Sequence, residues 1–139
     1  MTVNILQLLI RKLELYPDLK YKISDSKIFV EKPREDGFSL GLTIDDRGYN
    51  VSFDGWFKSF VNEQEALECF TFALSGKCRL KVYRKGNVDY KWTLQYKTEI
   101  DSKIEWHDDS TTGIQFYPFW KKEEVYFKQN NLKANLDNL

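Results

Sequence analysis

The sequence predicts an α+β fold in which a mainly antiparallel sheet of about six to eight strands carries two helices on one face, in the order α-β-β-β-α-β-β-β-β. Two segments have apolar residues at helical spacing, and most of the others alternate apolar with polar residues. Short turns join the alternating segments. These turns favour antiparallel pairing, because parallel strands need a longer crossover connection.

The first predicted helix spans residues 3–15, and its apolar positions repeat at helical spacing: Ile5, Leu6, Leu9 and Leu13. Pro17 ends the helix, because proline lacks the backbone N–H that continuation requires. Further apolar residues widen the stripe beyond what one packing face needs: Val3, Leu8 and Ile10. We therefore expect a homodimer that forms through this helix.

Residues 38–53 predict the first hairpin, with apolar and polar side chains alternating on both of its strands. Pairing Ile44 with Tyr49 aligns the two apolar rows on the inner face. The same register leaves very small side chains on the outer face, including Gly41 opposite Ser52.

The second predicted helix begins at Asn62, whose side chain is placed to cap it, with Glu65 at the capping-box spacing. Gly76 supplies a left-handed stop after the helix. The predicted buried stripe contains Ala66, Leu67, Phe70, Ala73 and Leu74.

Residues 78–96 predict a second hairpin, whose register depends on the length of its loop. A two-residue turn at residues 86–87 would mix polar with apolar rows. A loop one residue longer sets Val82 against Tyr90 and keeps the rows separate, so we expect a loop of odd length.

The remaining strands are expected within residues 27–33, 103–120 and 121–127. A polar tail follows from about residue 129. Because no linker or internal repeat divides the sequence, we expect a single domain of residues 1–139.

The composition excludes several broad classes of protein. Twenty-one basic and twenty-one acidic residues cancel, whereas proteins that grip nucleic acid or anionic membranes usually carry a positive excess. Two cysteines are too few for a disulfide framework, and no metal-binding spacing occurs. The N-terminal segment lacks the features of a signal peptide. We expect a soluble cytoplasmic protein with no cofactor, no membrane association and no nucleic-acid partner.

Three strings of residues carry a resemblance: "FDGWFKSF" at 53–60, "EALECFTFALSGKCRLKV" at 65–82 and "DSTTGIQFYPFW" at 109–120. Together they resemble small bacterial proteins with no assigned activity, over about residues 50–130. The resemblance implies a bacterial origin and adds no chemistry.

The stretch "HDDSTTG", residues 107–113, combines the single histidine of the chain with two carboxylates and three hydroxyls. Pairing Trp106 with Ile114 would make residues 109–111 a hairpin turn, in which short polar side chains hydrogen-bond their own backbone. The functional alternative makes His107 a general base oriented by Asp108 or Asp109. These residues are too few for a zinc site, so we expect no metal.

The second hairpin has a basic outer face with Lys77, Arg79, Lys81, Lys91 and Lys97. Three of these residues are the candidates for binding an anionic partner: Arg79, Lys81 and Lys91. Alternatively, the face is a solvated side of the sheet whose lysines block association between sheet edges. Tyr90, Trp92 and Tyr96 are expected to point inward, so they would not act as stacking platforms.

The aromatic run "FYPFW" at residues 116–120 is the other candidate binding segment. Pro118 interrupts the strand, so we expect neighbouring aromatic side chains to reach the surface: Tyr117, Phe119 and Trp120. Alternatively, these rings and the four tryptophans line a ligand cavity between the sheet and the helices, or form the core.

These observations favour a non-enzymatic cytosolic interaction module that binds a protein partner through its sheet face or edge. The two alternatives are a small-molecule-binding domain with an aromatic cavity and a small hydrolase or transferase. The enzyme would be centred on His107 with Asp108 or Asp109, but no nucleotide loop or nucleophile elbow supports it.

Overall fold

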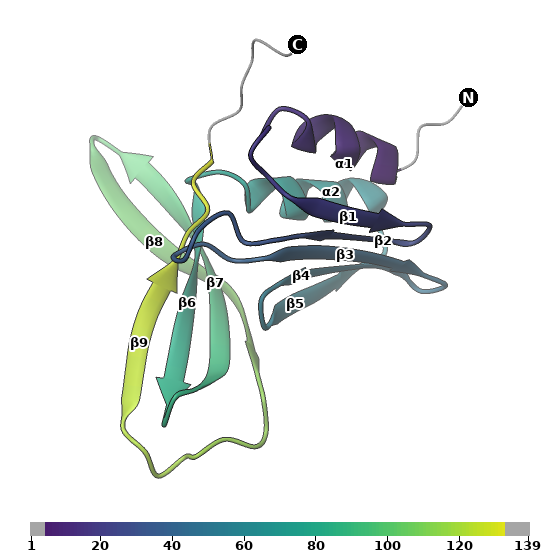
Figure 1. Ribbon diagram of the computed structural model, residues 1–139. Helices are drawn as coiled ribbons and strands as arrows, with labels where there is room; N and C mark the ends of the chain where they lie inside the picture. Colours follow the sequence, from purple (N-terminus) through teal and green to yellow (C-terminus); the bar gives the residue numbers. More distant parts are fainter. Residues whose placement is uncertain (1–4, 133–139) are drawn as a thin grey trace.

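The computed structural model describes residues 5–132, which form two helices and nine strands (Figure 1). The helices are α1 (Ile5–Leu13) and α2 (Glu63–Phe72). The strands before α2 are β1 (Tyr21–Ser24), β2 (Lys27–Val30), β3 (Leu40–Asp45), β4 (Gly48–Phe53) and β5 (Trp56–Phe60). The strands after α2 are β6 (Cys78–Lys85), β7 (Val88–Ile100), β8 (Lys103–Gly113) and β9 (Glu123–Lys128).

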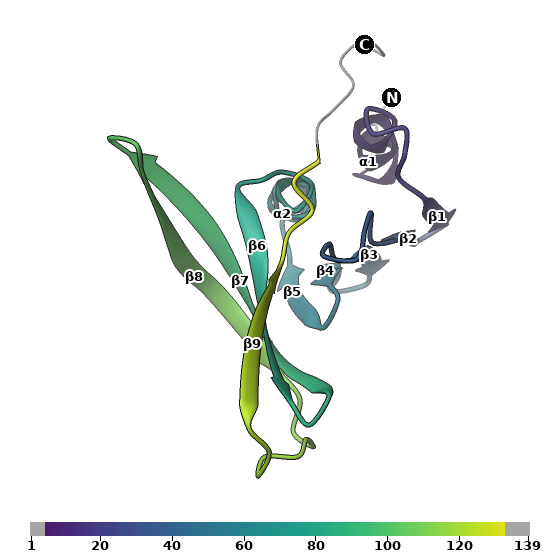
Figure 2. The ribbon, with the colours of Figure 1, turned by 60° about the vertical axis from the view of Figure 1, so that its left-hand side comes forward.

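The strands form two antiparallel sheets, with the orders β1-β2-β3-β4-β5 and β8-β7-β6-β9. The two helices lie together beside the five-stranded sheet, and the four-stranded sheet runs past β5 and away from them (Figures 1 and 2). The predicted α+β class is confirmed, but the prediction of one sheet with both helices on one face is wrong. Because α2 leads the chain away from the edge strand β5, β6 begins a second sheet.

The β3–β4 hairpin has the predicted register, in which Ile44 pairs with Tyr49. Asp45 stabilises the turn, because its carboxylate accepts hydrogen bonds from the backbone N–H groups of Arg47 and Gly48 at 2.8 and 3.1 Å. Gly48 has a φ of 138°, a backbone conformation that side chains disfavour. Local turn chemistry and alternation were therefore sufficient to predict this hairpin.

The β6–β7 hairpin turns through two residues, so the predicted odd loop is wrong. Gly86 and Asn87 have positive φ values of 56° and 68°, the conformation that a tight hairpin turn requires. A β-bulge keeps apolar residues opposite apolar residues instead. At this bulge Tyr83 pairs with Lys91 and Arg84 with Asp89, so Tyr90 has no partner on β6. Val82 consequently pairs with Trp92 and not with Tyr90.

The stretch predicted to contain a turn at residues 109–111 is part of the continuous strand β8, so that turn is absent from the structure. Trp106 pairs with β7 and not with Ile114. The actual turn is at Asp101 and Ser102, which have positive φ values of 53° and 67°. The prediction failed because β7 is 13 residues long and offers β8 a partner along its whole length.

One hydrophobic cluster contains residues from both helices and both sheets, and its largest fully buried side chains include Trp56, Phe38, Phe53 and Phe70. At the junction of the sheets, Gly55 lies against Trp92, where an added Cβ would approach the ring to 2.4 Å. Beside it, Trp56 Nε1–H donates hydrogen bonds to the Ser110 carbonyl and hydroxyl oxygens at 3.2 and 3.1 Å. The β4–β5 turn and the start of β5 thus connect the two sheets.

The helix α1 buries the predicted stripe of Ile5, Leu6, Leu9 and Leu13. Of the residues that widen this stripe, Leu8 and Ile10 are half-buried in the fold, and Val3 lies outside the described residues. Homodimerisation through α1 therefore stays a prediction.

The helix α2 begins as predicted, because the Asn62 side chain accepts a hydrogen bond from the Glu65 N–H at 3.0 Å. Its end differs from the prediction. The helix is capped at Ala73 in a right-handed conformation, and Gly76 does not have a positive φ.

The polar segment after β9 is packed against the fold in its first residues. Asn130 is fully buried; its side chain accepts a hydrogen bond from Phe38 N–H and donates one to the Ala73 carbonyl. Leu132 N–H donates to the Leu74 carbonyl at 2.8 Å. The tail expected from about residue 129 therefore begins with ordered contacts, and residues 133–139 lie outside the described part of the chain.

Candidate functional site

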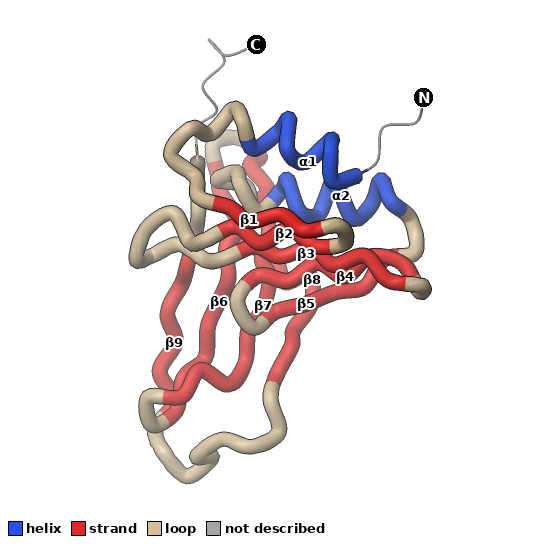
Figure 3. The backbone as a smooth tube through the Cα atoms, turned by 45° about the vertical axis from the view of Figure 1, so that its right-hand side comes forward, coloured by secondary structure: helices blue, strands red, loops and turns tan. Residues whose placement is uncertain are grey.

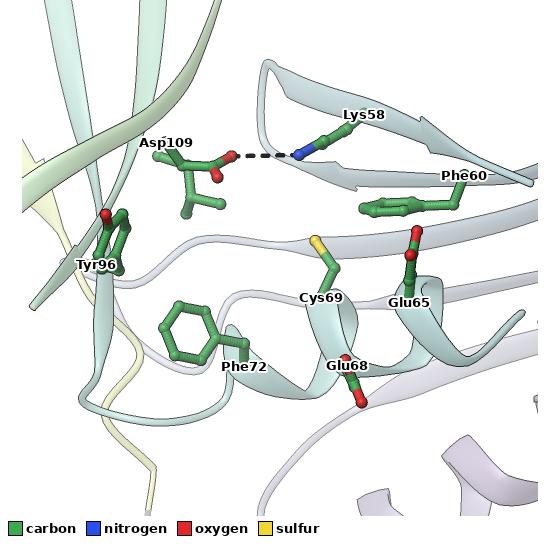
Figure 4. Close-up of a pocket in the computed structure, with 9 residues that line it drawn as sticks. Lys58, Phe60, Glu65, Glu68, Cys69, Phe72, Tyr96 and Asp109 are labelled. Carbon is green, nitrogen blue, oxygen red and sulfur yellow. Dashed lines mark ion pairs between the residues drawn. The ribbon is translucent and has the colours of Figure 1, made fainter. Parts of the chain in front are cut away.

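A cleft of about 420 Å³ lies where α2 meets β5 and the inner side of the β7–β8 pair (Figure 4). This volume is within the range of small-molecule sites. The lining residues are Lys58, Phe60, Glu65, Glu68, Cys69, Phe72, Leu94, Tyr96 and Asp109. The cleft therefore combines an apolar surface with three carboxylates and one ammonium group.

A second β-bulge turns Asp109 toward this cleft. Leu94 pairs with Ser110 and Gln95 with Asp108, so the pairing of β7 with β8 passes over Asp109. The Asp109 carboxylate lies 3.7 Å from Lys58 Nζ and accepts a hydrogen bond from the Ser110 hydroxyl at 2.9 Å. Without the bulge, strict alternation would place Asp109 and Ser110 on opposite faces of the sheet.

The neighbouring carboxylate has a different environment. Asp108 lies on the outer face of the sheet, where it accepts a hydrogen bond from Gln95 Nε2 at 2.8 Å. The two adjacent aspartates of the sequence are thus directed to opposite faces.

Cys69 lies within the cleft and is an unsuitable nucleophile. Burial raises the pKa of the Cys69 thiol to about 12, an effect that nearby Lys58 opposes and Asp109 increases. The thiol is therefore protonated at neutral pH, whereas nucleophilic catalysis requires the thiolate. Cys78 is fully buried and its pKa is likewise raised to about 12 by burial, as expected for a residue of the core.

His107, the general base of the alternative hypothesis, contacts other residues. Its Nε2 lies 2.8 Å from Thr98 Oγ1 and 4.0 Å from a Glu105 carboxylate oxygen, and its ring stacks on Tyr96. Neither aspartate is a hydrogen-bond or ion-pair partner of this histidine within residues 5–132. The structure therefore does not bring together the three residues of the alternative catalytic hypothesis.

Metal binding was not expected from the sequence. Within residues 5–132, no three His, Cys, Asp or Glu side chains are arranged to hold a metal ion.

The three candidate binding cations of the basic face, Arg79, Lys81 and Lys91, lie over aromatic rings of the four-stranded sheet. The Arg79 guanidinium lies between the rings of Trp106 and Phe127, at 4.1 and 4.0 Å from their centroids. Its Nε–H donates to Gln95 Oε1 at 2.8 Å, and burial lowers the pKa of Arg79. This arrangement of Arg79 between two rings was not predicted from the sequence, because Trp106 was expected to pair with Ile114 and not with β7.

The two candidate lysines of this face also lie over a ring. Lys81 Nζ is 5.1 Å and Lys91 Nζ 4.2 Å from the centroid of the Tyr83 ring. Tyr90, which was expected to point inward, is at the bulge, and its ring lies 6.4 Å from that of Tyr83. The three candidate binding cations therefore contact aromatic rings of the same chain.

The aromatic loop, residues 114–122, lies at the end of the four-stranded sheet that is farthest from the helices (Figures 1 and 3). Phe119 and Trp120 are each 69% exposed. Phe116, which sequence reasoning did not select, is 89% exposed. Tyr117 behaves differently, because its ring stacks on Tyr90 at 4.2 Å between centroids. Pro118, the signal for an interrupted strand, correctly indicated this segment.

Comparisons of the chain with protein-family models, with curated proteins and with solved structures give no match. The resemblance to small bacterial proteins therefore stays a prediction. Neither helix of residues 5–132 has the length and apolar character needed to cross a membrane.

Proposed function

We propose that the chain is a non-enzymatic binding module that binds a protein partner through the aromatic loop. The observation that carries this proposal is the exposure of three large rings in one short segment: 89% for Phe116 and 69% for both Phe119 and Trp120. Large aromatic side chains dominate the energetics of protein interfaces. A cluster of them at the surface of a chain is typical of an interaction site.

The loop is held in place before any partner binds. The stacking of Tyr117 on Tyr90 anchors its centre, and Tyr90 in turn donates a hydrogen bond from its hydroxyl to Glu123 on β9. Lys85 Nζ donates to the Phe119 carbonyl at 3.2 Å. Because these contacts fix the backbone in the free protein, less conformational entropy is lost on binding.

The position of the loop favours a protein partner over the alternatives. The loop that carries the exposed rings lies at the end of the four-stranded sheet (Figure 3), so these rings suit insertion into a pocket of a larger molecule. A nucleic-acid partner would be held mainly by cations, but Arg79, Lys81 and Lys91 already lie over aromatic rings.

The proposal is tested with the double variant Phe119→Ser/Trp120→Ser in a quantitative co-purification from the native host. The matched control is Phe57→Ser, because Phe57 is 61% exposed but lies on β5 in the other sheet. Both variants should keep the stability of the wild type within about 1 kcal/mol, since they remove exposed side chains.

We expect a stoichiometric protein partner that the wild type and Phe57→Ser retain and the loop variant loses. A partner that the loop variant retains at full stoichiometry would contradict the assignment of the loop. The absence of any stoichiometric protein partner of the wild type would contradict the proposed function as a whole.

A further inference from the structure

The cleft between α2, β5 and β8 is separate from the aromatic loop and has a chemistry of its own. We propose that it binds a small organic cation, whose ammonium group contacts Asp109 in place of the Lys58 ammonium, with Glu65 as a further negative charge at the cleft, and whose apolar body lies on the aromatic floor. This site is independent of the proposed protein interaction, because none of the residues of the aromatic loop lines the cleft.

The floor of the cleft suits an apolar body. The rings of Phe60, Phe72 and Tyr96 and the side chain of Leu94 line it (Figure 4). The Cys69 thiol between them is protonated, so this part of the floor carries no charge. None of the four tryptophans lines this cleft, so the aromatic cavity predicted from them is not this one.

The charges around the cleft select a cation. Three carboxylates and one ammonium line it, which leaves an excess of two negative charges. The Glu65 side chain rises from α2 toward the Phe60 ring, whereas the Glu68 carboxylate points away from the ion pair at the opposite side (Figure 4). An organic anion would be repelled by these groups, and a neutral ligand would gain hydrogen bonds to the carboxylates but no ionic attraction.

Lys58 shows how an ammonium group is held at this site. Its Nζ lies 3.7 Å from the Asp109 carboxylate and 5.6 Å from the centroid of the Phe60 ring. A carboxylate on one side and a ring face on the other is the environment that organic ammonium ions prefer in proteins. Lys58 is half exposed and can swing into solvent, because its side chain is long and flexible.

The β-bulge supports a role for Asp109 in binding. A bulge interrupts the hydrogen-bond ladder, and bulges are found where a side chain is re-aimed toward a site. Here the bulge directs a carboxylate to the rim of a cleft, where its ion pair with Lys58 is long and partly exposed. Such a pair contributes little to folding, so stability alone does not account for it.

The experiment uses 2-phenylethylamine, which is a cation at neutral pH, and 2-phenylethanol, its neutral counterpart of the same shape. Each probe is titrated into the ¹⁵N-labelled full chain, and amide shifts are followed by NMR. We expect saturable shifts with the amine at residues 58–60, 65–72 and 109, with a dissociation constant in about the millimolar range. The alcohol should bind at least about five-fold more weakly.

Two charge variants should change the affinity for the amine in opposite directions. Glu65→Gln should weaken binding by about two- to five-fold, and Lys58→Gln should strengthen it by about as much, because the competing ammonium is removed. The matched controls Glu31→Gln and Lys20→Gln are exposed residues outside the cleft and should leave the affinity unchanged.

The proposal would be overturned by no saturable shift with the amine up to about 10 mM, by equal binding of the amine and the alcohol, or by weaker amine binding in Lys58→Gln. The loop variant Phe119→Ser/Trp120→Ser should bind the amine as the wild type does. Loss of amine binding in that variant would place the probe on the exposed rings and would also overturn the cleft assignment.

Discussion

The hydrogen bonds of Trp56 connect the two sheets, and their removal should destabilise the fold measurably. Trp56 is fully buried, its ring stacks on Phe53, and its Nε1–H donates to both acceptors of Ser110. Trp56→Phe keeps an aromatic ring against Phe53 but removes the donor. The Ser110 carbonyl and hydroxyl then lose the Trp56 Nε1–H donor that they share.

The expected loss of stability follows from two contributions. Removal of the N–H takes one hydrogen-bond donor away from two part-buried acceptors, which costs about 1–1.5 kcal/mol. The smaller ring leaves a void of about 40 Å³, which at about 24 cal/mol per Å³ costs about 1 kcal/mol. We therefore expect the free energy of unfolding to fall by about 2–2.5 kcal/mol.

The measurement is equilibrium unfolding in urea, with the slope of the transition compared between variants to confirm that the unfolded states are similar. Trp120→Phe is the matched control, because it makes the same substitution at a side chain that is 69% exposed, and it should change stability by less than about 0.5 kcal/mol. Equal effects of the two substitutions would refute the reasoning. They would mean that Trp56 on β5 does not contact Ser110 on β8, and that residues 109–111 are available for the turn predicted from the sequence.

Two further predictions concern reactivity and association. Cys69 and Cys78 have pKa values of about 12 in the folded protein against 9.0 ordinarily, so at about pH 8 the fraction of thiolate is about a thousand-fold smaller in the folded state. Iodoacetamide should therefore alkylate both thiols only after unfolding, and stability should decrease as the pH rises above 9.0, because only the unfolded chain then releases these protons. For α1, whose Leu8 and Ile10 are half-buried, we expect a dimer in light scattering at tens of micromolar; a monomer would contradict dimerisation.

The parts of the fold that depend on local chemistry could be predicted from the sequence. The register of Ile44 with Tyr49 and the cap at Asn62 both follow from residues a few positions apart. In such segments the backbone hydrogen bonds are satisfied by near neighbours, so pattern and structure agree. The exposure of Phe119 and Trp120 followed from Pro118 for the same reason.

The division into two sheets could not be predicted from the sequence, because it depends on contacts between distant segments. Gly55 packs against Trp92 and Trp56 bonds to Ser110, and nothing in the alternation of either segment specifies these pairs. The strands β1 and β5 were missed as well. β5 is only five residues long and has a single fully buried side chain, so its alternation is weak.

The four-stranded sheet departs from strict alternation at two bulges, and both departures bear on the proposed function. An argument from alternation assumes that each residue of a strand pairs with one residue of the neighbouring strand. This assumption fails at the bulges that contain Tyr90 and Asp109. The first bulge places the ring on which Tyr117 stacks, and the second directs a carboxylate to Lys58. A bulge sacrifices ladder hydrogen bonds, so it persists where the redirected side chain compensates for that loss. Both redirected side chains belong to the surfaces that we propose for binding, so the two departures from alternation coincide with the two proposed sites.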